Sequence, residues 1–393
     1  MVNNSKLTKR TKIKHMTQLA EYRENVIRPE HELRTLFIEM TGLCNEHCRH
    51  CGSNCGDFKE ENPLTTVEIK RFLEQVREDL PIERLRLVVT GGEPLLRKDF
   101  FEIMAYAKKL GFGWGMTSNG TLITADVAKK LAECGMKTIS VSLDGLKEEH
   151  EWFRQTTGSY EKTVAGIKNL VAQGAFYHVQ VTTVVTHRNI GMLKEMYREF
   201  SKLGVRSWRV INIEPIGRAK EQEELLLNAE EYRQLFNFIA EYRLGDPELE
   251  ATRKKRLRNL TESGYSYDSW VPGDPMEVTY GCSHYLGVEA EREVRKWYFL
   301  CNAGVYTASI CYNGDIIACL DIERRPELVQ GNIRKDRFSK VWNEGYEIFR
   351  TDYRKTGKCA DCPDYKFCAG DAYHTWNFDE NRPNLCLKGI LWK

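Results

Sequence analysis

The chain has 393 residues, which is enough for a full-sized catalytic domain and a second, smaller one. Its formal net charge of +2 gives no reason to expect a nucleic acid or an anionic membrane as a partner. No apolar run approaches the roughly 20 residues of a membrane-spanning helix, and the N-terminus has no signal-peptide pattern, so we expect a cytoplasmic protein. Its thirteen cysteines then indicate metal or redox chemistry, because reducing compartments keep thiols free.

The first 33 residues are polar and basic, and then weakly helical. We interpret them as a solvated tail and a lead-in helix rather than a docking arm, because runs of charge usually form solvated faces.

From residue 34 to about 245 the pattern alternates between strand and helix six times. The expected strands are 33–40, 84–90, 113–118, 137–143, 178–186 and 207–214, and the expected helices are 66–79, 98–110, 124–134, 159–173, 189–203 and 229–243. Such alternation predicts an α/β fold with a parallel sheet and right-handed crossovers. Periodicity alone fits either a doubly wound sheet or a partial (β/α)6 barrel of the TIM type.

The loop after the first strand carries Cys44, Cys48 and Cys51 in a C-x3-C-x2-C array. Three thiolates hold only three irons of a [4Fe–4S] cube, so the fourth iron is left open for a ligand that is not protein. His50 precedes the third thiolate, where a flat side chain could stack on a base. The array resembles the signature of the radical S-adenosylmethionine (SAM) enzymes, which implies that the open iron chelates the amino and carboxylate groups of SAM.

Small or polar loops follow the other strands, which favours the barrel, because barrel enzymes place their chemistry at the C-terminal ends of the strands. In the loop after the second strand, the two glycines would let backbone approach the methionine part of SAM, and Glu93 could accept from its ammonium. The family resemblance implies SAM contacts for the residues of this loop and of the later ones. These candidates are Gly91, Gly92, Glu93, Pro94, Ser118, Asn119, Ser142, Asp144 and Arg154. Taken singly, each of these loops is also ordinary turn chemistry.

Residues 246–281 connect the two halves of the chain. The basic run 253–258 is interpreted as a solvated face, with a track for an acidic peptide as the alternative. The turn-rich stretch 271–275 marks the domain boundary.

The last third, 282–393, is predicted to be a small, irregular, Cys-rich domain. A hairpin turn at Asn313-Gly314 brings Cys301 and Cys319 to one end of a ribbon. The pattern formed by these two cysteines with Cys359, Cys362, Cys368 and Cys386 resembles the SPASM domain, the auxiliary-cluster module of radical SAM enzymes that modify peptides and proteins. A zinc site for the last four thiolates is the alternative.

The resemblance is incomplete at one position. The full SPASM pattern has a further cysteine where this chain has Ala372. Cys359, Cys362, Cys368 and Cys386 still suffice for one auxiliary cluster, whereas Cys282, Cys301 and Cys319 leave a second one short of a thiolate. We therefore predict an open or non-cysteine-ligated iron there, with Asp371, His374, water or a substrate thiolate as its ligand. Cys55, Cys134 and Cys311 are interpreted as structural.

Asp321 is a candidate for proton transfer, because in sulfatase-maturing relatives an Asp adjacent to the corresponding cysteine acts as a base. Here Leu320 intervenes, and the alternative is a surface carboxylate. The segments around Cys51 and Cys319 also resemble a radical SAM/SPASM group that is associated with small lipoproteins.

The resemblance implies reductive cleavage of SAM to a 5′-deoxyadenosyl radical, which then modifies a peptide or small protein by hydrogen abstraction. A flavodoxin- or ferredoxin-type protein would supply the electron. The alternatives are an enzyme of small-molecule cofactor assembly and an iron–sulfur electron carrier or sensor that never cleaves SAM.

Overall fold

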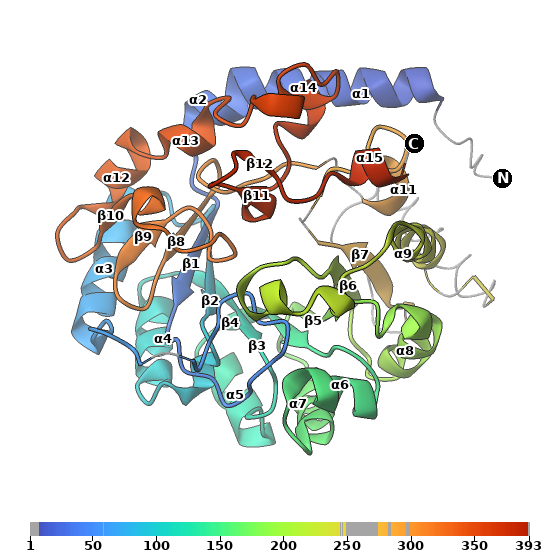
Figure 1. The fold of residues 1–393 in the computed structure, drawn as a ribbon. Helices are drawn as coiled ribbons and strands as arrows, with labels where there is room; N and C mark the ends of the chain where they lie inside the picture. The colour runs from blue at the N-terminus through green and yellow to red at the C-terminus, as the bar shows by residue number, and fades with distance from the viewer. Residues whose placement is uncertain are drawn as a thin grey trace.

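The structure is a computed structural model that describes residues 8–57, 59–243, 245, 247–248, 274–281, 284–295 and 299–391. Its centre is a ten-stranded sheet in the order β10-β9-β8-β1-β2-β3-β4-β5-β6-β7. Strands β1 to β7 run parallel and form an arc with helices along its outer side (Figure 1). The end strands β10 and β7 do not pair with each other, so the barrel is partial, as predicted.

All six predicted strands and all six predicted helices of this part are present, with ends that differ by a few residues. The strands of the sheet are β1 (Thr35–Glu39), β2 (Arg86–Thr90), β3 (Gly113–Ser118), β4 (Met136–Ser142), β5 (His178–Val185), β6 (Ser207–Asn212), β7 (Glu277–Tyr280), β8 (Thr307–Ile310), β9 (Asp315–Ile317) and β10 (Gly331–Asn332). A second, two-stranded sheet consists of β11 (Trp376–Asn377) and β12 (Arg382–Pro383).

The predicted helices correspond to α3 (Thr66–Asp79), α4 (Phe100–Lys109), α5 (Ala125–Glu133), α7 (Ser159–Gln173), α8 (Leu193–Ser201) and α9 (Ala229–Tyr242). The sequence did not predict α6 (Lys147–Arg154). The C-terminal region contains the short helices α11 (Glu291–Val294), α12 (Phe338–Glu344), α13 (Glu347–Arg350), α14 (Tyr365–Cys368) and α15 (Leu387–Leu391). Thr65 caps α3 in a capping box with Glu68, as the sequence signal indicated.

Side chains alternate along each strand, and every second one points to the outer side of the arc, where it packs in the core between the sheet and the helices. On β6, Trp208 is fully buried and packs edge-on against Phe200 of α8 and Phe238 of α9. Because successive strand residues point to opposite faces, the residues between the core positions face the inside of the arc.

The expected lead-in helix is present as α1 (Lys9–Tyr22), but one of its faces is buried rather than solvated. Lys12 and Met16 on it are buried, and the helix contacts α14. Just beyond α1, Arg23 donates to the carbonyl oxygens of Lys366 (2.8 Å) and Phe367 (3.3 Å). The basic side chains of the N-terminal segment, which the sequence predicted to be solvated, thus lie partly in an interface with the C-terminal region (Figure 1).

The sheet does not stop at the predicted domain boundary. Strand β8 from the C-terminal region pairs in parallel with β1, and β9 then pairs antiparallel with β8 through the predicted Asn313-Gly314 turn. Strand β7, from the connecting segment, extends the other side. The remainder of that segment, including the basic run 253–258 and residues 271–273, lies outside the described residues.

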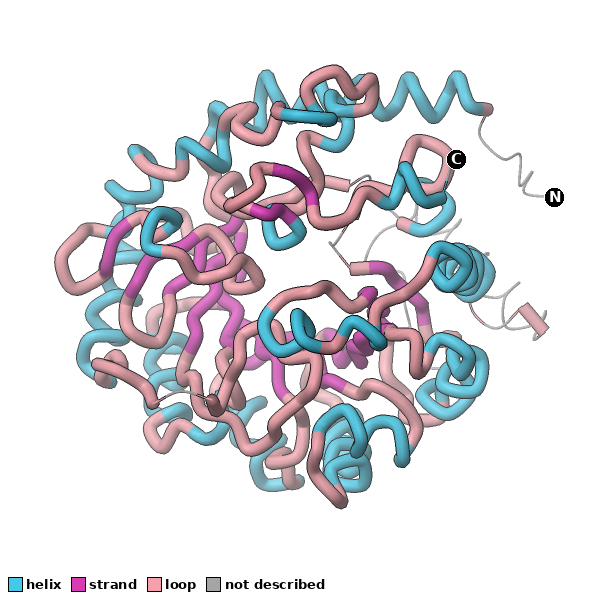
Figure 2. Tube along the Cα trace, in the orientation of Figure 1, coloured by secondary structure: helices cyan, strands magenta, loops and turns pink. Residues whose placement is uncertain are grey.

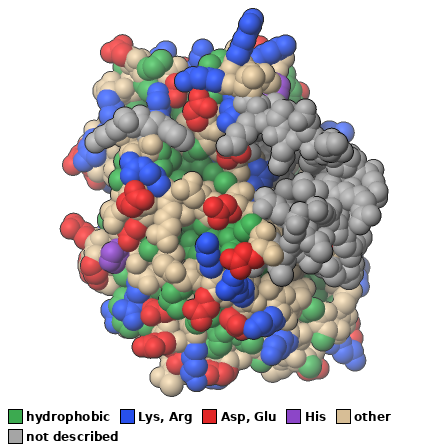
Figure 3. Space-filling model, turned by 90° about the vertical axis from the view of Figure 1, so that its right-hand side faces the viewer, with side chains coloured by type: hydrophobic (Ala, Val, Ile, Leu, Met, Phe, Trp, Pro, Cys, Tyr) green, Lys and Arg blue, Asp and Glu red, His purple; other side chains and the backbone are tan. Residues whose placement is uncertain are grey.

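In the part of the chain that the structure describes, no helix is long and apolar enough to cross a membrane. Acidic and basic side chains alternate over the face that Figure 3 shows, so the described surface on that side has no large patch of one sign.

Candidate functional site

The loop after β1 holds the three-cysteine array against the ends of the neighbouring strands. Backbone bonds fix it there, from Gly92 N to the oxygen of Thr41 (2.8 Å) and from Glu93 N to that of Leu43 (2.9 Å). A Cβ at Gly92 would stand 2.0 Å from the Leu43 oxygen, so only glycine lets these two loops meet. The glycines after β2 therefore make room for the array itself, a role that the sequence did not indicate.

The loop after β6 holds the array from the other side (Figure 1). Arg218 donates from Nε to the oxygen of Cys48 (2.7 Å), from Nη1 to that of Cys55 (3.2 Å), and pairs with Asp57. Its own N–H donates to the oxygen of Cys51 (3.0 Å). Sequence reasoning missed Arg218, although a basic residue in a loop at a strand end was a usable signal.

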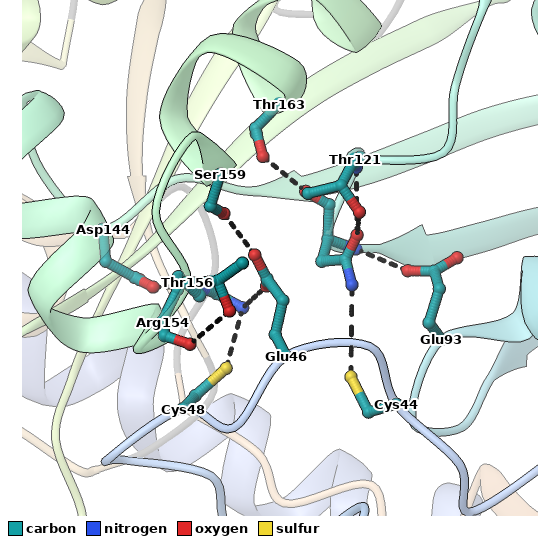
Figure 4. A network of polar contacts seen from close by, with 12 residues as sticks. Cys44, Glu46, Cys48, Glu93, Thr121, Asp144, Arg154, Thr156, Ser159 and Thr163 are labelled. Atoms are coloured by element: carbon teal, nitrogen blue, oxygen red, sulfur yellow. Dashed lines mark hydrogen bonds and ion pairs between the residues drawn. The ribbon is translucent and has the colours of Figure 1, made fainter.

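Glu93 is fully buried and accepts hydrogen bonds from its neighbours on β3. Ser118 Oγ lies 2.9 Å and 3.0 Å from its two carboxylate oxygens, and Asn119 N lies 2.8 Å from one of them. Burial raises the pKa of Glu93 to about 7, against the hydrogen bonds that lower it. Asn119 also points Nδ2 towards Cys44 Sγ, at 4.0 Å (Figure 4). Three predicted SAM residues are thus brought together beside the array.

A second buried group lies on the other side of the array. Arg154 of α6 pairs with Asp144 (2.5 Å) and Glu46 (3.4 Å), and its Nη1 lies 3.4 Å from Cys48 Sγ (Figure 4). Burial works to raise the pKa of Asp144, but Arg154 and His50 outweigh it and hold that pKa well below its usual range. Glu46, inside the array, also accepts from Ser159 and was missed by the sequence reading.

His50 turns its Nε2 towards Asp144 Oδ2, at 3.3 Å, and meets Phe153 edge-on. Its Nδ1 is buried without a hydrogen-bond partner among the described residues, and so is Arg154 Nε. Ser142 ends β4 on the inner face, and Pro94 is buried at the start of a short 3-10 turn. All the predicted SAM residues therefore lie on one rim of the barrel.

Burial raises the pKa of Cys48 to about 12, while a hydrogen bond with the Cys55 thiol lowers that of Cys51 to about 5. Cys55 is thus buried, as a structural cysteine would be, yet it contacts the array. Cys134 and Cys311 are buried away from it, and the Cys134 thiol donates to the oxygen of Phe101.

In the C-terminal region, the cysteines of the CxxCx5C…C pattern influence one another's pKa values. Burial raises the pKa of Cys359, and the nearby Cys362 and Cys386 raise it further; Cys386 acts in the same way on Cys368. No three His, Cys, Asp or Glu side chains of the described residues are grouped as around a single metal ion. Their ligation of a cluster stays a prediction.

The other predicted auxiliary ligands are less grouped. Cys301 and Cys368 both line a cavity with an empty volume of about 340 Å³, together with Arg23, Arg28 and Arg354. Cys319 lines a different cavity, of about 410 Å³, and its Sγ lies 3.9 Å from Oδ2 of the exposed Asp321. Ala372 is buried in the same apolar cluster that Cys301 and Cys368 contact. Cys282 lies outside the described residues.

Asp371 and His374 were predicted as possible ligands of the open iron. Asp371 is already engaged, because its carboxylate lies 2.7 Å from His284 Nδ1 and accepts from Tyr285 N. His284 Nε2 lies 2.7 Å from Glu214 at the end of β6. Burial works to lower the pKa of His284, but the two carboxylates raise it to about 10. His374 is half-buried in a 3-10 turn.

Comparison with known proteins finds matches to two separate parts of the chain. The sequence profile of the radical SAM superfamily matches residues 38–200, and that of the SPASM iron–sulfur cluster-binding domain matches residues 301–363. An AdoMet-dependent heme synthase from Oleidesulfovibrio alaskensis is 28% identical over 341 residues, which are 86% of this chain and 82% of that protein. The mycofactocin maturase MftC from Mycolicibacterium smegmatis is 28% identical over 342 residues, which are 85% and 76% of the two chains. The crystal structure of Streptococcus suis SuiB bound to its precursor peptide SuiA has a TM-score of 0.68 at 16% identity and covers 96% of this chain and 80% of SuiB.

Proposed function

We propose that this chain is an enzyme that cleaves SAM reductively and uses the radical to modify a peptide or protein, because the radical SAM and SPASM profiles both match it. Its cofactors are [4Fe–4S] clusters and SAM. The chemistry that they supply when bound is one-electron cleavage of SAM to methionine and a 5′-deoxyadenosyl radical. The protein binds, orients and excludes water.

Cys44, Cys48 and Cys51 are the residues that would hold the SAM-binding cluster. The array fits such a group because its loop is fixed by backbone bonds on both sides and a guanidinium lies against Cys48. Thiolate ligands are anionic, so a buried cation beside them offsets part of their charge.

Glu93 would receive the ammonium of SAM. In the part of the chain that the structure describes, its hydrogen-bond partners are neutral donors, and burial raises its pKa to about 7 although these donors lower it. A bound ammonium favours the ionised carboxylate, so ligand and residue stabilise each other. Ser118 and Asn119 keep the carboxylate oriented for that contact.

Ser142, Asp144, Arg154 and His50 would hold the remaining polar groups of SAM. The support is that buried polar atoms of this group, His50 Nδ1 and Arg154 Nε, have no partner among the described residues. Unsatisfied buried polar atoms are costly, and a ligand's polar groups would remove that cost.

The auxiliary clusters would lie in the C-terminal region. Cys359, Cys362, Cys368 and Cys386 would hold one, and Cys282, Cys301 and Cys319 would hold the other with an iron left open where the pattern lacks its cysteine at Ala372. Burial of Ala372 in the apolar cluster that Cys301 contacts supports this arrangement, because a methyl group stands where the full pattern has a thiol. Since His284 and Tyr285 already engage Asp371, water or a substrate group is the better candidate for the open iron.

The observation that favours a peptide substrate is the similarity to MftC, a maturase, over most of both chains. We expect the anaerobically reconstituted protein to release 5′-deoxyadenosine when dithionite and SAM are added. Absence of that product would leave only an electron carrier or sensor. A peptide encoded next to the gene, deuterated at its side chains, should transfer label into 5′-deoxyadenosine.

The similarity to heme synthases over an equal length favours a second candidate, modification of a tetrapyrrole. Another relative, 26% identical over 311 residues, is named an Fe-coproporphyrin III synthase, so we choose this iron porphyrin as the tetrapyrrole to test beside the peptide. Loss of carbon dioxide from its side chains, detected by mass spectrometry, would select the tetrapyrrole candidate over the peptide.

A further inference from the structure

Arg209 on β6 is the side chain from which this inference starts. Its neighbours Trp208 and Val210 are fully buried against the helices, so Arg209 is on the inner face of the arc. It pairs in register with Thr182 of β5 and Thr279 of β7. A guanidinium is thus held on the strand next to the β7 end of the sheet, on the inner face of the barrel.

Among the residues that the structure describes, this guanidinium has no hydrogen-bond or ion-pair partner. Nε of Arg209 is buried without a hydrogen bond, and no described carboxylate lies within ion-pair distance of the side chain. Some other arginines of the barrel site have carboxylate partners, as Arg218 has Asp57 and Arg324 has Glu39. Arg49, by contrast, resembles Arg209 in having a buried Nε without a hydrogen bond. A buried N–H without a hydrogen bond is costly, so Nε of a half-buried cation kept in this state indicates an anion that completes it.

The surrounding side chains are neutral and satisfy one another. Ser140 and Thr182 lie 2.6 Å apart, Gln180 bonds to Ser140 (3.2 Å), and His178 lies 2.7 Å from Ser207. These groups form a hydrogen-bonded layer on the inner face of β4, β5 and β6 that needs no ligand. Arg209 differs from them, because its charge is left without a partner.

The register also fixes how far Arg209 lies from the predicted SAM site. Ser142 pairs with Thr182, and Thr182 pairs with Arg209. Two strand spacings separate Ser142 from Arg209, which is roughly 10 Å between backbones. A substrate held by Arg209 would therefore reach the rim on which SAM is proposed to bind.

We propose that Arg209 binds a carboxylate of the substrate inside the barrel. The inference rests on the proposed function, since it assigns the substrate's chemistry to the same site. The planar fork of arginine donates two parallel hydrogen bonds to a carboxylate, which fixes its orientation as well as its position. An acidic peptide group and a porphyrin propionate share this chemistry, and the experiment separates them.

Binding is measured on reconstituted protein with SAM and without reductant, so failure of SAM cleavage does not affect it. The first probe is Fe-coproporphyrin III against its tetramethyl ester, followed by absorbance. The second is an amidated heptapeptide library with Asp and Glu at its variable positions against the same library with Asn and Gln, captured on immobilised protein and quantified by mass spectrometry. Preference for the free acid in the porphyrin experiment would identify a propionate as the group that binds, and preference for the acidic library would identify an Asp or Glu side chain of a peptide.

In one of the two arms, the wild-type protein should bind the acid form about 10- to 100-fold more tightly than the neutral form. Arg209→Gln should lose this preference, and Arg209→Lys should keep part of it. Arg198→Gln removes the same charge from the outer helix α8, where Arg198 is half-exposed and pairs with Glu248, and should keep all of it. No preference in either arm, or a preference that survives in Arg209→Gln, would overturn the proposal.

Two further measurements separate binding from folding and from the cofactor site. Arg209→Ala should regain acid preference when millimolar guanidinium is added, which a purely structural role of Arg209 would not produce. A loss of SAM affinity in Arg209→Gln as large as that in Glu93→Gln would place Arg209 at the cofactor and count against a substrate role.

Discussion

The two cysteine-rich regions of this protein are built in opposite ways. The array after β1 is fixed by backbone bonds to the loop after β2, by Arg218 and by a bond from Arg49 N to the oxygen of Phe153 (2.9 Å). The cysteines of the C-terminal region are on short elements and loops, and Cys386 is exposed (Figure 2). Bonds to the loops after β2 and β6 hold the first site, whereas the second lies on short elements and loops and is held through contacts such as those of Arg23 with the carbonyl oxygens of Lys366 and Phe367.

We therefore expect that binding of a cluster stabilises the fold less at the array after β1 than at the C-terminal cysteines. A site that the scaffold forms without metal loses only chemistry when its ligands are removed. A site whose ligands lie on loops contributes its binding energy to folding, as small metal domains do. The predictions below test this contrast, starting with the largest effect.

Replacing Cys44, Cys48 and Cys51 together by alanine should abolish formation of 5′-deoxyadenosine, because no thiolate remains to hold the SAM-binding cluster. The circular dichroism spectrum should stay unchanged, since backbone bonds hold the loop. Cys134→Ala, another buried cysteine, should retain activity and serves as the matched control. Product formation by the triple variant, measured by mass spectrometry, would contradict the assignment.

Replacing Cys359 and Cys362 by alanine should lower bound iron and make the C-terminal region accessible to protease. We expect the midpoint of thermal unfolding to fall by about 5 °C, since cluster binding is coupled to folding there. Trypsin should cut near Lys355 and Lys366 faster than in the wild type or in the triple variant of the first array. Equal cleavage in all three proteins would remove the contrast between the regions.

Glu93→Gln should raise the dissociation constant of SAM about 10- to 100-fold, because it replaces a charge-assisted bond by a neutral one. Calorimetry without reductant measures this directly. Glu102→Gln, at an exposed position of α4, is the matched control and should bind normally. An unaltered affinity in Glu93→Gln would exclude Glu93 from the ammonium site.

The pH dependence of SAM affinity follows from the same residue. Burial raises the pKa of free Glu93 to about 7, so the carboxylate is increasingly protonated as the pH falls below that value. Only the ionised form attracts an ammonium, so affinity should weaken by up to about tenfold per pH unit below 7 and level off above it. Titrations between pH 6 and 8 should show this slope in the wild type and a flat profile in Glu93→Gln.

Asp321→Asn should have the smallest effect. Asp321 is exposed and contacts Cys319 only at 3.9 Å, which favours a surface carboxylate over a base. The turnover rate should change far less than the roughly 100-fold or greater loss that follows removal of a general base. A loss of that size, with SAM cleavage intact, would restore Asp321 as a proton-transfer residue.

Much of the fold was predictable because hydrophobic periodicity and caps are local signals. The helix over 66–79 was predicted to the residue, helped by its Thr65–Glu68 capping box, and the Asn313-Gly314 turn was placed correctly. The helix that carries Arg154 was missed, because it has only eight residues and is too short to show a clear helical periodicity. Burial of Lys12 was missed because a lysine in a sequence predicts a solvent-exposed position unless the groups that it pairs with are known.

The sequence by itself determined the partial barrel, the three-cysteine array and the loops that surround it, since spacing and strand order suffice to bring strand ends to one rim. Only the tertiary structure decided that the glycines after β2 admit the cysteine loop, that Arg218 clamps it, that Asp371 is engaged by His284, and that Arg209 is left unpaired. These are facts about which distant groups meet. Long-range contacts depend on how the whole chain closes, and no local pattern of residues encodes them.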